Sequence, residues 1–305
     1  MDVLQNGQPT PHAPLNFDDL FTAIGAELFF AEIWEKQPAI LKLRKDNFAR
    51  ICDLTGPLEI GRLAGLARDG AQAWLSNDYV EHSVFPVDPA TASQYFDIGA
   101  TLYFLNIPIP ALTDTMADAL GVPRDRLIAS LFLTPAGGGA APHFDKNENF
   151  TIQLTGQKSW TVADEPTISN PHKGYFFDQA IPPALKLLGM DKARRPPGRS
   201  YTLTPGTMLY VPRGTAHSTQ AEEQSWSLNI SYTGLMWADV LIDALYQYLL
   251  TRPVWRRSAI GLAESSNPAA RNQNIAPALI ADLSQALATG DLLEILATHL
   301  EDAKS

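Results

Sequence analysis

Cysteine is almost absent from this chain, which holds Cys52 alone among its 305 residues. An intrachain disulfide is therefore excluded, and a reducing cytoplasm is the expected location. Cys52 follows the apolar Ile51 and is expected to be a small core residue rather than a nucleophile. Long apolar runs are also missing, since no stretch reaches the roughly 18 residues of a membrane span. The N-terminus has neither the basic nor the apolar region of a signal peptide, so we expect no membrane partner.

Basic residues are scarce relative to acidic ones, with 23 Lys and Arg against 33 Asp and Glu and a net charge of -10. Binding to a phosphate backbone requires clustered Lys and Arg. The charge balance therefore argues against nucleic acid as a partner. A local basic cluster runs from Lys192 to Arg199 in a Pro-rich stretch. It is expected to be a solvated loop, with attraction of an acidic substrate as the alternative.

The sequence does contain many short apolar segments separated by Gly, Pro, Asn and Asp. They lie at residues 73–75, 101–105, 128–133, 150–154, 159–162, 200–203, 208–211 and 226–232. Short strands with such boundaries are typical of a β-sandwich or barrel. Helices are expected before these strands, from Asp18 and at 46–69, and one helix at 110–120 interrupts the strands. A first strand is expected at 39–43. The Pro- and Gly-rich segment 165–199 is the longest insertion between strands and is expected to be functional or mobile.

These patterns divide the chain into three parts. Residues 1–15 are expected to be a flexible arm, and residues 16–233 a mainly β domain with helices, whose core lies at about 100–233. Residues 234–305 have helical periodicity and two amphipathic faces, the second at 278–300. Either both faces cover the barrel, or one of them forms a homodimer interface.

A histidine and a carboxylate occur two positions apart, at His143 and Asp145. On a strand, positions i and i+2 point to the same side, so the imidazole and the carboxylate are expected to meet at one spot. His217, which follows the apolar strand 208–211 and a Pro-x-Gly turn, is the expected third ligand. Two His and one carboxylate with open positions opposite form the ligand set of non-haem Fe(II) oxygenases. The glycine run 137–139 is expected to let the backbone approach a small ligand closely.

The other histidines are weaker candidates for this site. They are His12 in the arm, His82, His172 in the insertion and His299 near the C-terminus. His82 could approach the site in the folded chain, but it is interpreted as a surface or core side chain.

Further motifs surround the metal-ligand pair. They are Pro142-His143-Phe144-Asp145, Asn149-Phe150, Gly156-Gln157-Lys158-Ser159-Trp160, Pro205-Gly206, Val211-Pro212-Arg213-Gly214, Leu228-Asn229 and, more loosely, Trp34-Glu35-Lys36-Gln37-Pro38. Together they make the stretch from about 131 to 232 similar to the catalytic core of JmjC-type, cupin-like 2-oxoglutarate oxygenases. Within these it resembles the factor-inhibiting-HIF-type asparaginyl hydroxylases and the bacterial ribosomal oxygenases. The resemblance implies a double-stranded β-helix (cupin, jelly-roll) core with N-terminal and C-terminal helices.

The resemblance also implies roles for the matching residues. His143, Asp145 and His217 match the ligands of Fe(II). Lys158 matches the basic residue that binds the distal carboxylate of 2-oxoglutarate. A buried lysine is costly without an anionic partner, which agrees with that role. The alternative for Lys158 is a solvent-facing position on a hairpin.

Three polar residues complete the cofactor-binding set that the resemblance implies. Thr134 matches a hydroxyl that binds the same distal carboxylate. Asn149 and Asn229 match amide side chains that line the iron and cosubstrate pocket. Both asparagines lie in otherwise apolar strands and need partners in any case, so a structural role is the alternative for them.

The implied activity is hydroxylation of a C–H bond with O2 and 2-oxoglutarate, first of a protein or peptide side chain. The alternatives are a free amino acid or natural product as substrate, lysine demethylation, a non-oxygenase metal cupin (isomerase or hydrolase), and a non-catalytic JmjC-like binding protein. The metal cupin would not need Lys158, and a non-catalytic member usually loses part of the triad or this lysine. Loops 76–100 and 165–199 are expected to face the substrate. Candidate substrate contacts, each with a structural alternative, are Tyr103, Asn106, Arg213 and Trp226.

Overall fold

The computed structural model describes residues 15–17, 24–75, 84–190, 196–234, 236–258 and 275–289. In chain order the elements are α2 (Ala26–Glu32), β1 (Ala39–Lys42), α3 (Lys45–Thr55), α4 (Ile60–Leu66), β2 (Ala71–Leu75), β3 (Phe85–Val87), α5 (Ala92–Asp97), β4 (Ala100–Phe104), α6 (Pro110–Leu120), η2 (Arg124–Arg126), β5 (Leu127–Thr134), β6 (Gly139–Phe144), β7 (Glu148–Thr155), β8 (Lys158–Ala163), β9 (Tyr175–Phe176), α7 (Pro183–Leu187), β10 (Gly198–Leu203), β11 (Thr207–Val211), β12 (His217–Ala221), β13 (Ser225–Tyr232), α8 (Trp237–Thr251) and α10 (Ile275–Thr289). The chain divides into two compact units, residues 1–233 and 234–305. None of the described helices combines the length and the apolar character needed to cross a membrane. The arm expected at residues 1–15, apart from Leu15, and the helix start expected at Asp18 lie outside the described residues.

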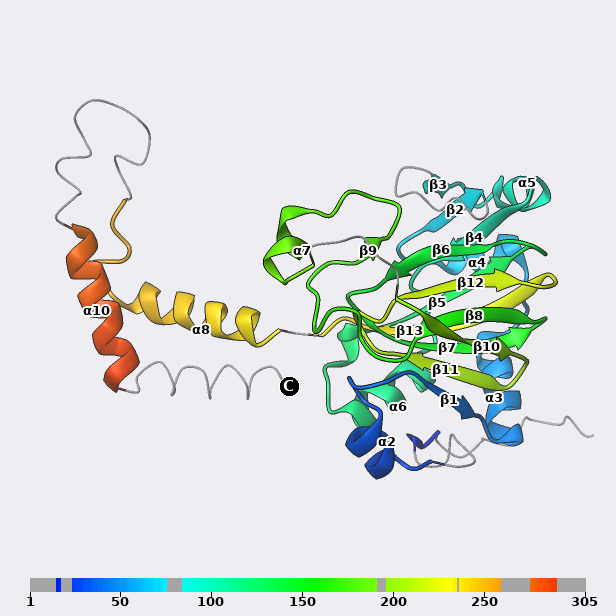
Figure 1. Cartoon of the computed structure of the whole chain (residues 1–305), viewed down its shortest axis with the longest axis horizontal. Helices are drawn as coiled ribbons and strands as arrows, with labels where there is room; N and C mark the ends of the chain where they lie inside the picture. The colour runs from blue at the N-terminus through cyan, green and yellow to red at the C-terminus, as the bar shows by residue number, and fades with distance from the viewer. Residues whose placement is uncertain are drawn as a thin grey trace, which may run out of the picture. The chain divides into compact units, whose positions relative to one another are not determined.

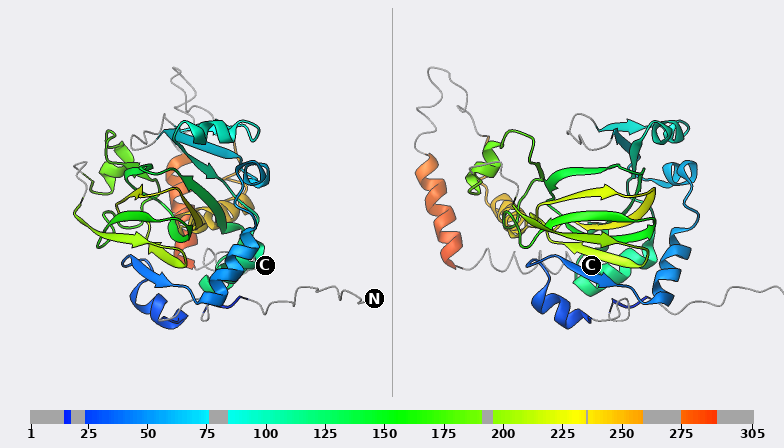
Figure 2. Two further views of the ribbon diagram at one scale, coloured as in Figure 1. Left: turned by 90° about the vertical axis from the view of Figure 1, so that its right-hand side faces the viewer. Right: turned by 45° about the vertical axis from the view of Figure 1, so that its right-hand side comes forward.

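Two antiparallel sheets form the first unit (Figure 1). The larger sheet has the strand order β1-β11-β7-β13-β5-β4-β2-β3, and the smaller one has the order β10-β8-β12-β6-β9. Figure 2 shows the strands of the smaller sheet lying against those of the larger one. From β5 to β8 and from β10 to β13 the chain alternates between the two sheets, which is the winding of a jelly roll. The expected double-stranded β-helix core with flanking helices is therefore confirmed.

Side-chain alternation separates the main core from an interior cavity. On β7 and β13, the cavity-facing side chains are Asn149, Thr151, Ser227, Asn229 and Ser231. The residues between them belong to the main hydrophobic cluster, namely Phe150, Ile152, Leu228 and Ile230. The same cluster takes in Phe29 of α2, Ile51 of α3 and Leu112 of α6. Burying each such side chain contributes about 1.5–3 kcal/mol, so the larger sheet gains its stability on the face that carries the helices.

The interior of the barrel is apolar only in part. A smaller cluster occupies the region of β8, β10 and β11, and consists of Trp160, Val162, Leu203, Leu209 and Val211. The remaining interior, between β5, β7, β13 and the smaller sheet, keeps its polar side chains around the cavity. Strand alternation thus directs polar groups into one half of the barrel.

Two connections cross between the sheets beside the cavity. The corner 145–147 links β6 to β7, and the corner 212–216 links β11 to β12. The backbone N–H of Gly214 donates to Asp145 O at 2.8 Å, so the two corners are in direct contact. Gly214 has a φ of +76°, and a Cβ there would overlap Ile168 O. Only glycine fits this turn without strain.

The glycine run 137–139 has a different purpose from the one expected. A Cβ at Gly139 would overlap the backbone oxygen of Thr219 on β12. Gly139 does line the cavity, but its missing side chain makes room for the neighbouring strand rather than for a ligand. Gly137 adopts a φ of +78°, which favours glycine for conformational reasons. The run therefore allows β6 to pair closely with β12.

The second unit contains α8 and α10 among its described residues. Asp282 of α10 forms an ion pair with Arg252 and accepts a hydrogen bond from Trp255 Nε1 at 2.8 Å. Large apolar side chains remain exposed on α8, including Trp237 at 73% and Ile242 at 62%. Helices were expected here. The part of the expected face 278–300 beyond Thr289 lies outside the described residues.

Candidate functional site

The three expected metal ligands come together at the corners of the barrel. His143 lies on β6 and is paired with His217, the first residue of β12. Asp145 lies just beyond β6, on the corner 145–147. One ligand atom from each side chain lies within 4.8 Å of the other two. Asp145 Oδ1 is 3.9 Å from His143 Nε2, and Oδ2 is 3.6 Å from His217 Nε2.

Backbone carbonyls orient both imidazole rings. His143 Nδ1 lies 2.7 Å from Ala141 O, and His217 Nδ1 lies 2.9 Å from Thr215 O. A carbonyl oxygen can only accept, so each Nδ1 carries a proton and each Nε2 keeps its lone pair in the neutral ring. The Nε2 atoms are those directed towards Asp145. This tautomer is the one that metal ligation requires, and the donor set of two imidazoles and one carboxylate suits Fe(II).

Aromatic rings cover one face of each imidazole. Phe176 stacks on His143 with a centroid distance of 4.9 Å, and Trp160 stacks on His217 at 5.6 Å. Trp160 comes from β8, whereas Phe176 lies on β9, inside the insertion 165–199, and pairs with β6. The insertion therefore contributes directly to the walls of the metal centre.

An amide relay leads from the cavity wall to the carboxylate ligand. Thr151 Oγ1 donates to Asn229 Oδ1 at 2.9 Å, and Asn229 Nδ2 donates to Asn149 Oδ1 at 3.2 Å. Asn149 Nδ2 then donates to Asp145 Oδ2 at 2.8 Å. Ser231 also donates to Asn149 Oδ1, at 3.1 Å. Because a carboxylate can only accept, Asn149 must direct its Nδ2 to Asp145 and its Oδ1 to Asn229, which sets the orientation of both amides.

Lys158 is a buried cation, with 4% of its surface exposed. Its Nζ donates to Thr134 Oγ1 at 2.9 Å and to Ser227 Oγ at 3.2 Å, and lies 5.9 Å from the centre of the Phe132 ring. It forms no ion pair with any carboxylate among the residues that the structure describes. Desolvation by burial lowers the pKa of Lys158 to about 7. A buried ammonium with two hydroxyl partners is suited to binding an anion.

These groups face a single cavity of about 250 Å³. It is lined by every site residue expected from the sequence: His143, Asp145, His217, Lys158, Thr134, Asn149 and Asn229. The metal ligands and the buried cation are thus accessible to one bound molecule.

Comparison with known proteins assigns this region to a family. Residues 108–240 match the family model described as the JmjC domain. Residues 108–240 are therefore similar to JmjC domains and are named the JmjC domain for this similarity. The resemblance expected from the motifs around His143 and Asp145 is confirmed.

Relatives of the JmjC domain include named oxygenases. The chain is 27% identical over 268 residues to the uncharacterized protein YxbC of Bacillus subtilis (strain 168), covering 82% of this chain and 81% of that protein. It is 28% identical over 268 residues to Ribosomal oxygenase 2 of Bos taurus, covering 77% of this chain but 53% of the bovine protein. The chain thus spans about half the length of this bovine relative. YcfD, a ribosomal oxygenase from Escherichia coli solved with cobalt and succinic acid, superposes with a TM-score of 0.56 at 20% identity, covering 93% of this chain and 71% of YcfD. At that identity the likeness demonstrates a shared fold.

Several residues that line the cavity were not recognised from the sequence. They are Trp74, Phe132, Thr151, Trp160, Phe176, Ser227 and Ser231. Thr151, Ser227 and Ser231 alternate with apolar residues on β7 and β13, and this period of two could have identified them. The aromatic residues carried no such signal, because large apolar side chains are ordinary in strands.

Among the four candidate substrate contacts, Tyr103 lines the cavity of the JmjC domain. Its ring stacks on Phe132 with centroids 4.2 Å apart, and burial raises its pKa. Asn106 instead donates to Asp69 at 3.1 Å, and Trp226 stacks on Phe104 in the main core.

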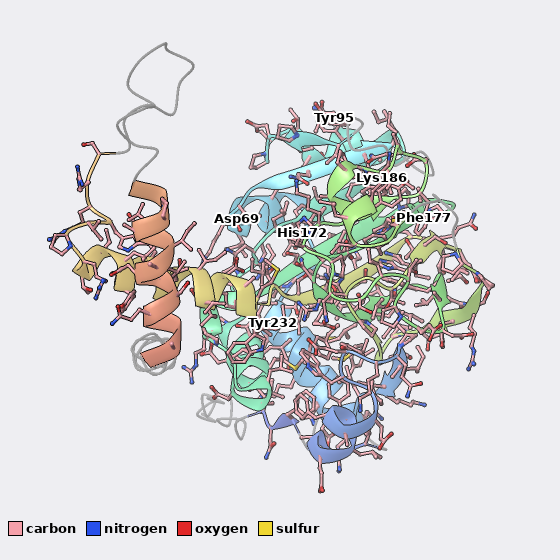
Figure 3. All side chains as sticks on the ribbon, turned by 60° about the vertical axis from the view of Figure 1, so that its left-hand side comes forward. Asp69, Tyr95, His172, Phe177, Lys186 and Tyr232 are labelled. Atoms are coloured by element: carbon pink, nitrogen blue, oxygen red, sulfur yellow. The ribbon has the colours of Figure 1, made fainter. Side chains whose placement is uncertain are left out.

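Arg213 also points away from the cavity of the JmjC domain, since its guanidinium contacts Glu148 and Glu35. For Asn106, Trp226 and Arg213 the structural alternative is therefore correct. His172 is exposed on the insertion and does not line the cavity (Figure 3). His12, His82 and His299 lie outside the described residues.

Proposed function

We propose that this chain is an Fe(II)- and 2-oxoglutarate-dependent oxygenase that hydroxylates a C–H bond, most directly of a protein or peptide side chain. One observation supports this above the others. Two imidazoles and a carboxylate share a 250 Å³ cavity with a buried lysine that forms no ion pair with any described carboxylate. The relatives named ribosomal oxygenases support a protein substrate.

In this proposal each residue has a defined task. His143, Asp145 and His217 hold Fe(II), and the Nδ1 hydrogen bonds of both imidazoles keep Nε2 available for it. Fe(II) and 2-oxoglutarate together supply the oxidation of a C–H bond by O2, with release of succinate and CO2.

The cosubstrate is bound by the buried lysine and its two hydroxyl partners. Lys158, Thr134 and Ser227 bind the distal carboxylate of 2-oxoglutarate. The relay through Asn149 holds Asp145 in place, and Phe176 and Trp160 exclude water from the imidazole faces. No side chain needs to act as a general base, because the oxidation depends on the bound iron and cosubstrate.

Anaerobic spectroscopy tests this function directly. Metal-free protein mixed with Fe(II) and then 2-oxoglutarate is expected to develop the visible charge-transfer band of a chelated keto acid. The band should be absent in His143→Ala and should require far more 2-oxoglutarate in Lys158→Ala. If iron binds and no band forms, the proposal is wrong, and a metal cupin that does not use 2-oxoglutarate becomes the better interpretation.

The affinity for 2-oxoglutarate is expected to depend on pH. In the ligand-free protein the pKa of Lys158 is about 7. Binding of 2-oxoglutarate above that pH must therefore include uptake of a proton by Lys158. Affinity should then fall by up to about tenfold per pH unit from pH 7 towards pH 9. In Lys158→Arg the guanidinium stays charged, so the slope should disappear although the affinity is lower overall. Calorimetric titration of both proteins measures this, and parallel profiles would contradict it.

The finer expectations on location and assembly also belong to this proposal. A cytoplasmic protein agrees with the single Cys52. A homodimer formed through residues 234–305 agrees with the exposed Trp237 and Ile242 of α8. Both remain predictions.

A further inference from the structure

A charge cluster, largely buried except for the exposed Glu35, lies beside the two corners and has no task in the proposed reaction. It consists of Glu35, Glu148, Tyr210 and Arg213. Glu148 is 1% exposed and Tyr210 is fully buried, while the side chain of Arg213 is 18% exposed. Glu35 precedes β1, far from the other three in sequence, and is bound to Arg213 across 178 positions.

The contacts in the cluster are dense and directional. Arg213 Nε lies 3.3 Å from Glu148 Oε1, and the backbone N–H of Arg213 donates to Glu148 Oε2 at 3.3 Å. Tyr210 donates its hydroxyl proton to Glu148 Oε2 at 2.6 Å. On the other side, Arg213 Nη2 donates to Glu35 Oε1 at 2.8 Å, and the Glu35 N–H donates to the Tyr210 oxygen at 2.9 Å.

Stability alone does not account for such a cluster. Desolvation raises the pKa of Glu148 to about 7, although Tyr210 and the Arg213 charge act in the opposite direction. Replacing a buried ion pair by apolar groups of similar volume is often neutral or stabilising. A buried pair is therefore better understood through the geometry that it imposes.

The location of the pair identifies that geometry. Glu148 directly follows the corner 145–147, which carries Asp145, and Arg213 lies in the corner 212–216, which leads to His217. The two histidines lie opposite each other in the β6–β12 ladder, and backbone carbonyls orient their rings. Asp145 lies beyond the end of β6, outside any ladder, so its backbone depends on contacts between the corners, while Asn149 orients its carboxylate.

We propose that the Arg213–Glu148 pair is a positioning device for Asp145, which clamps the two corners so that the carboxylate meets the paired histidines. Together with the Gly214 N–H to Asp145 O bond, it joins the corners at three points. The inference rests on the proposed metal site and goes beyond it, because neither residue touches the metal ligands' side chains. Loss of the clamp should weaken metal binding through the carboxylate while leaving the histidine pair in place.

Co(II) binding to the full-length, metal-free protein without 2-oxoglutarate is the probe. Arg213→Met is expected to lower both the melting temperature and the Co(II) affinity, the latter at least about tenfold. The double variant Arg213→Met, Glu148→Gln removes both charges and keeps an acceptor for Tyr210. It should recover most of the melting temperature but not the affinity. Arg124→Met is the matched control, because Arg124 forms exposed ion pairs with Asp114 and Asp118. It should change neither quantity.

Each result decides the question. A double variant that regains both stability and Co(II) affinity would show a merely structural pair and overturn the inference, as would an Arg213→Met variant with affinity within twofold of the parent. If Arg213→Met does not fold, the double variant decides by itself. If the parent protein binds no Co(II), the proposed metal site fails, and this inference fails with it. If the parent and the double variant bind Co(II) equally well, the metal site stands and only this inference is overturned.

Discussion

Replacing Lys158 by methionine is expected to make the ligand-free protein more stable while abolishing its binding of 2-oxoglutarate. The ammonium is buried with two hydroxyls, Thr134 and Ser227, as hydrogen-bond partners. Methionine is unbranched and only one atom shorter than lysine, and it removes the charge, which should add about 1–2 kcal/mol to the free energy of unfolding. Losing one partner of a buried ion pair should weaken 2-oxoglutarate binding about 100-fold or more.

The pH dependence separates this mechanism from a general packing effect. The pKa of Lys158 is about 7 in the folded protein against 10.5 for an ordinary lysine. Between these values the unfolded chain binds more protons, so the stability of the parent protein rises with pH across that window. The gain in the free energy of unfolding of Lys158→Met over the parent should therefore be largest at or below pH 7 and decrease towards pH 9.5. Thermal melts of metal-free protein at several pH values measure it.

The control for this prediction is Lys42→Met, since Lys42 is exposed on β1. Its melting temperature should differ from the parent's by the same small amount at every pH. A Lys158→Met variant that melts below the parent at pH 7 would mean that Thr134 and Ser227 already satisfy the ammonium. The cavity would then need no anion.

Gly214→Ala is expected to lower the free energy of unfolding by at least about 3 kcal/mol, because strain at φ and overlap with backbone add together. The residue has a φ of +76°, and a Cβ would overlap Ile168 O. Moving the turn would also break the hydrogen bond from Gly214 N–H to Asp145 O and those that Gly214 O accepts from Thr167 and Ile168. Metal affinity should fall with stability, since Asp145 is a metal ligand in the proposed function.

The same substitution elsewhere provides the comparison. Gly65 lies on α4, and a Cβ there would meet no atom within 4 Å. Gly65→Ala should raise the free energy of unfolding by up to about 1 kcal/mol, because alanine favours the helix. Urea unfolding curves of both variants measure the difference. Equal stability of Gly214→Ala and the parent would show that the corner 212–216 can relax freely.

The metal centre was predictable because its signals are local. His143 and Asp145 are two residues apart, Lys158 follows in the Gly156–Trp160 motif, and His217 comes after the apolar strand 208–211 and its Pro-x-Gly turn. The helix at 110–120 was equally clear, since Pro110 begins it and Gly121 ends it in a left-handed conformation. Such features need no knowledge of the rest of the chain.

Other strands could not be predicted because they lack apolar periodicity. β6 begins with Gly139 and contains Pro142, β12 has the sequence His-Ser-Thr-Gln-Ala, and β9 is two residues long. Their pairing is determined by partners distant in the chain, which a local pattern does not contain. The same reason applies to Arg213, whose partners Glu148 and Glu35 lie 65 and 178 positions away. The sequence predicted Arg213 as a candidate substrate contact, with a structural role as the alternative, and only the folded chain brings the three residues together.

The larger sheet has an apolar outer face, and the side chains of β7 and β13 on its inner face are polar, which has a consequence for the evolution of this domain. Phe150, Ile152 and their neighbours hold the sheet to the helices without touching the cavity. Side chains on the inner face can therefore be exchanged at little cost to folding, since the contacts that stabilise the sheet lie on its other side. A lineage built on this scaffold can change which molecules the cavity accepts through residues such as Tyr103 and Phe132 while its thermal stability stays nearly constant.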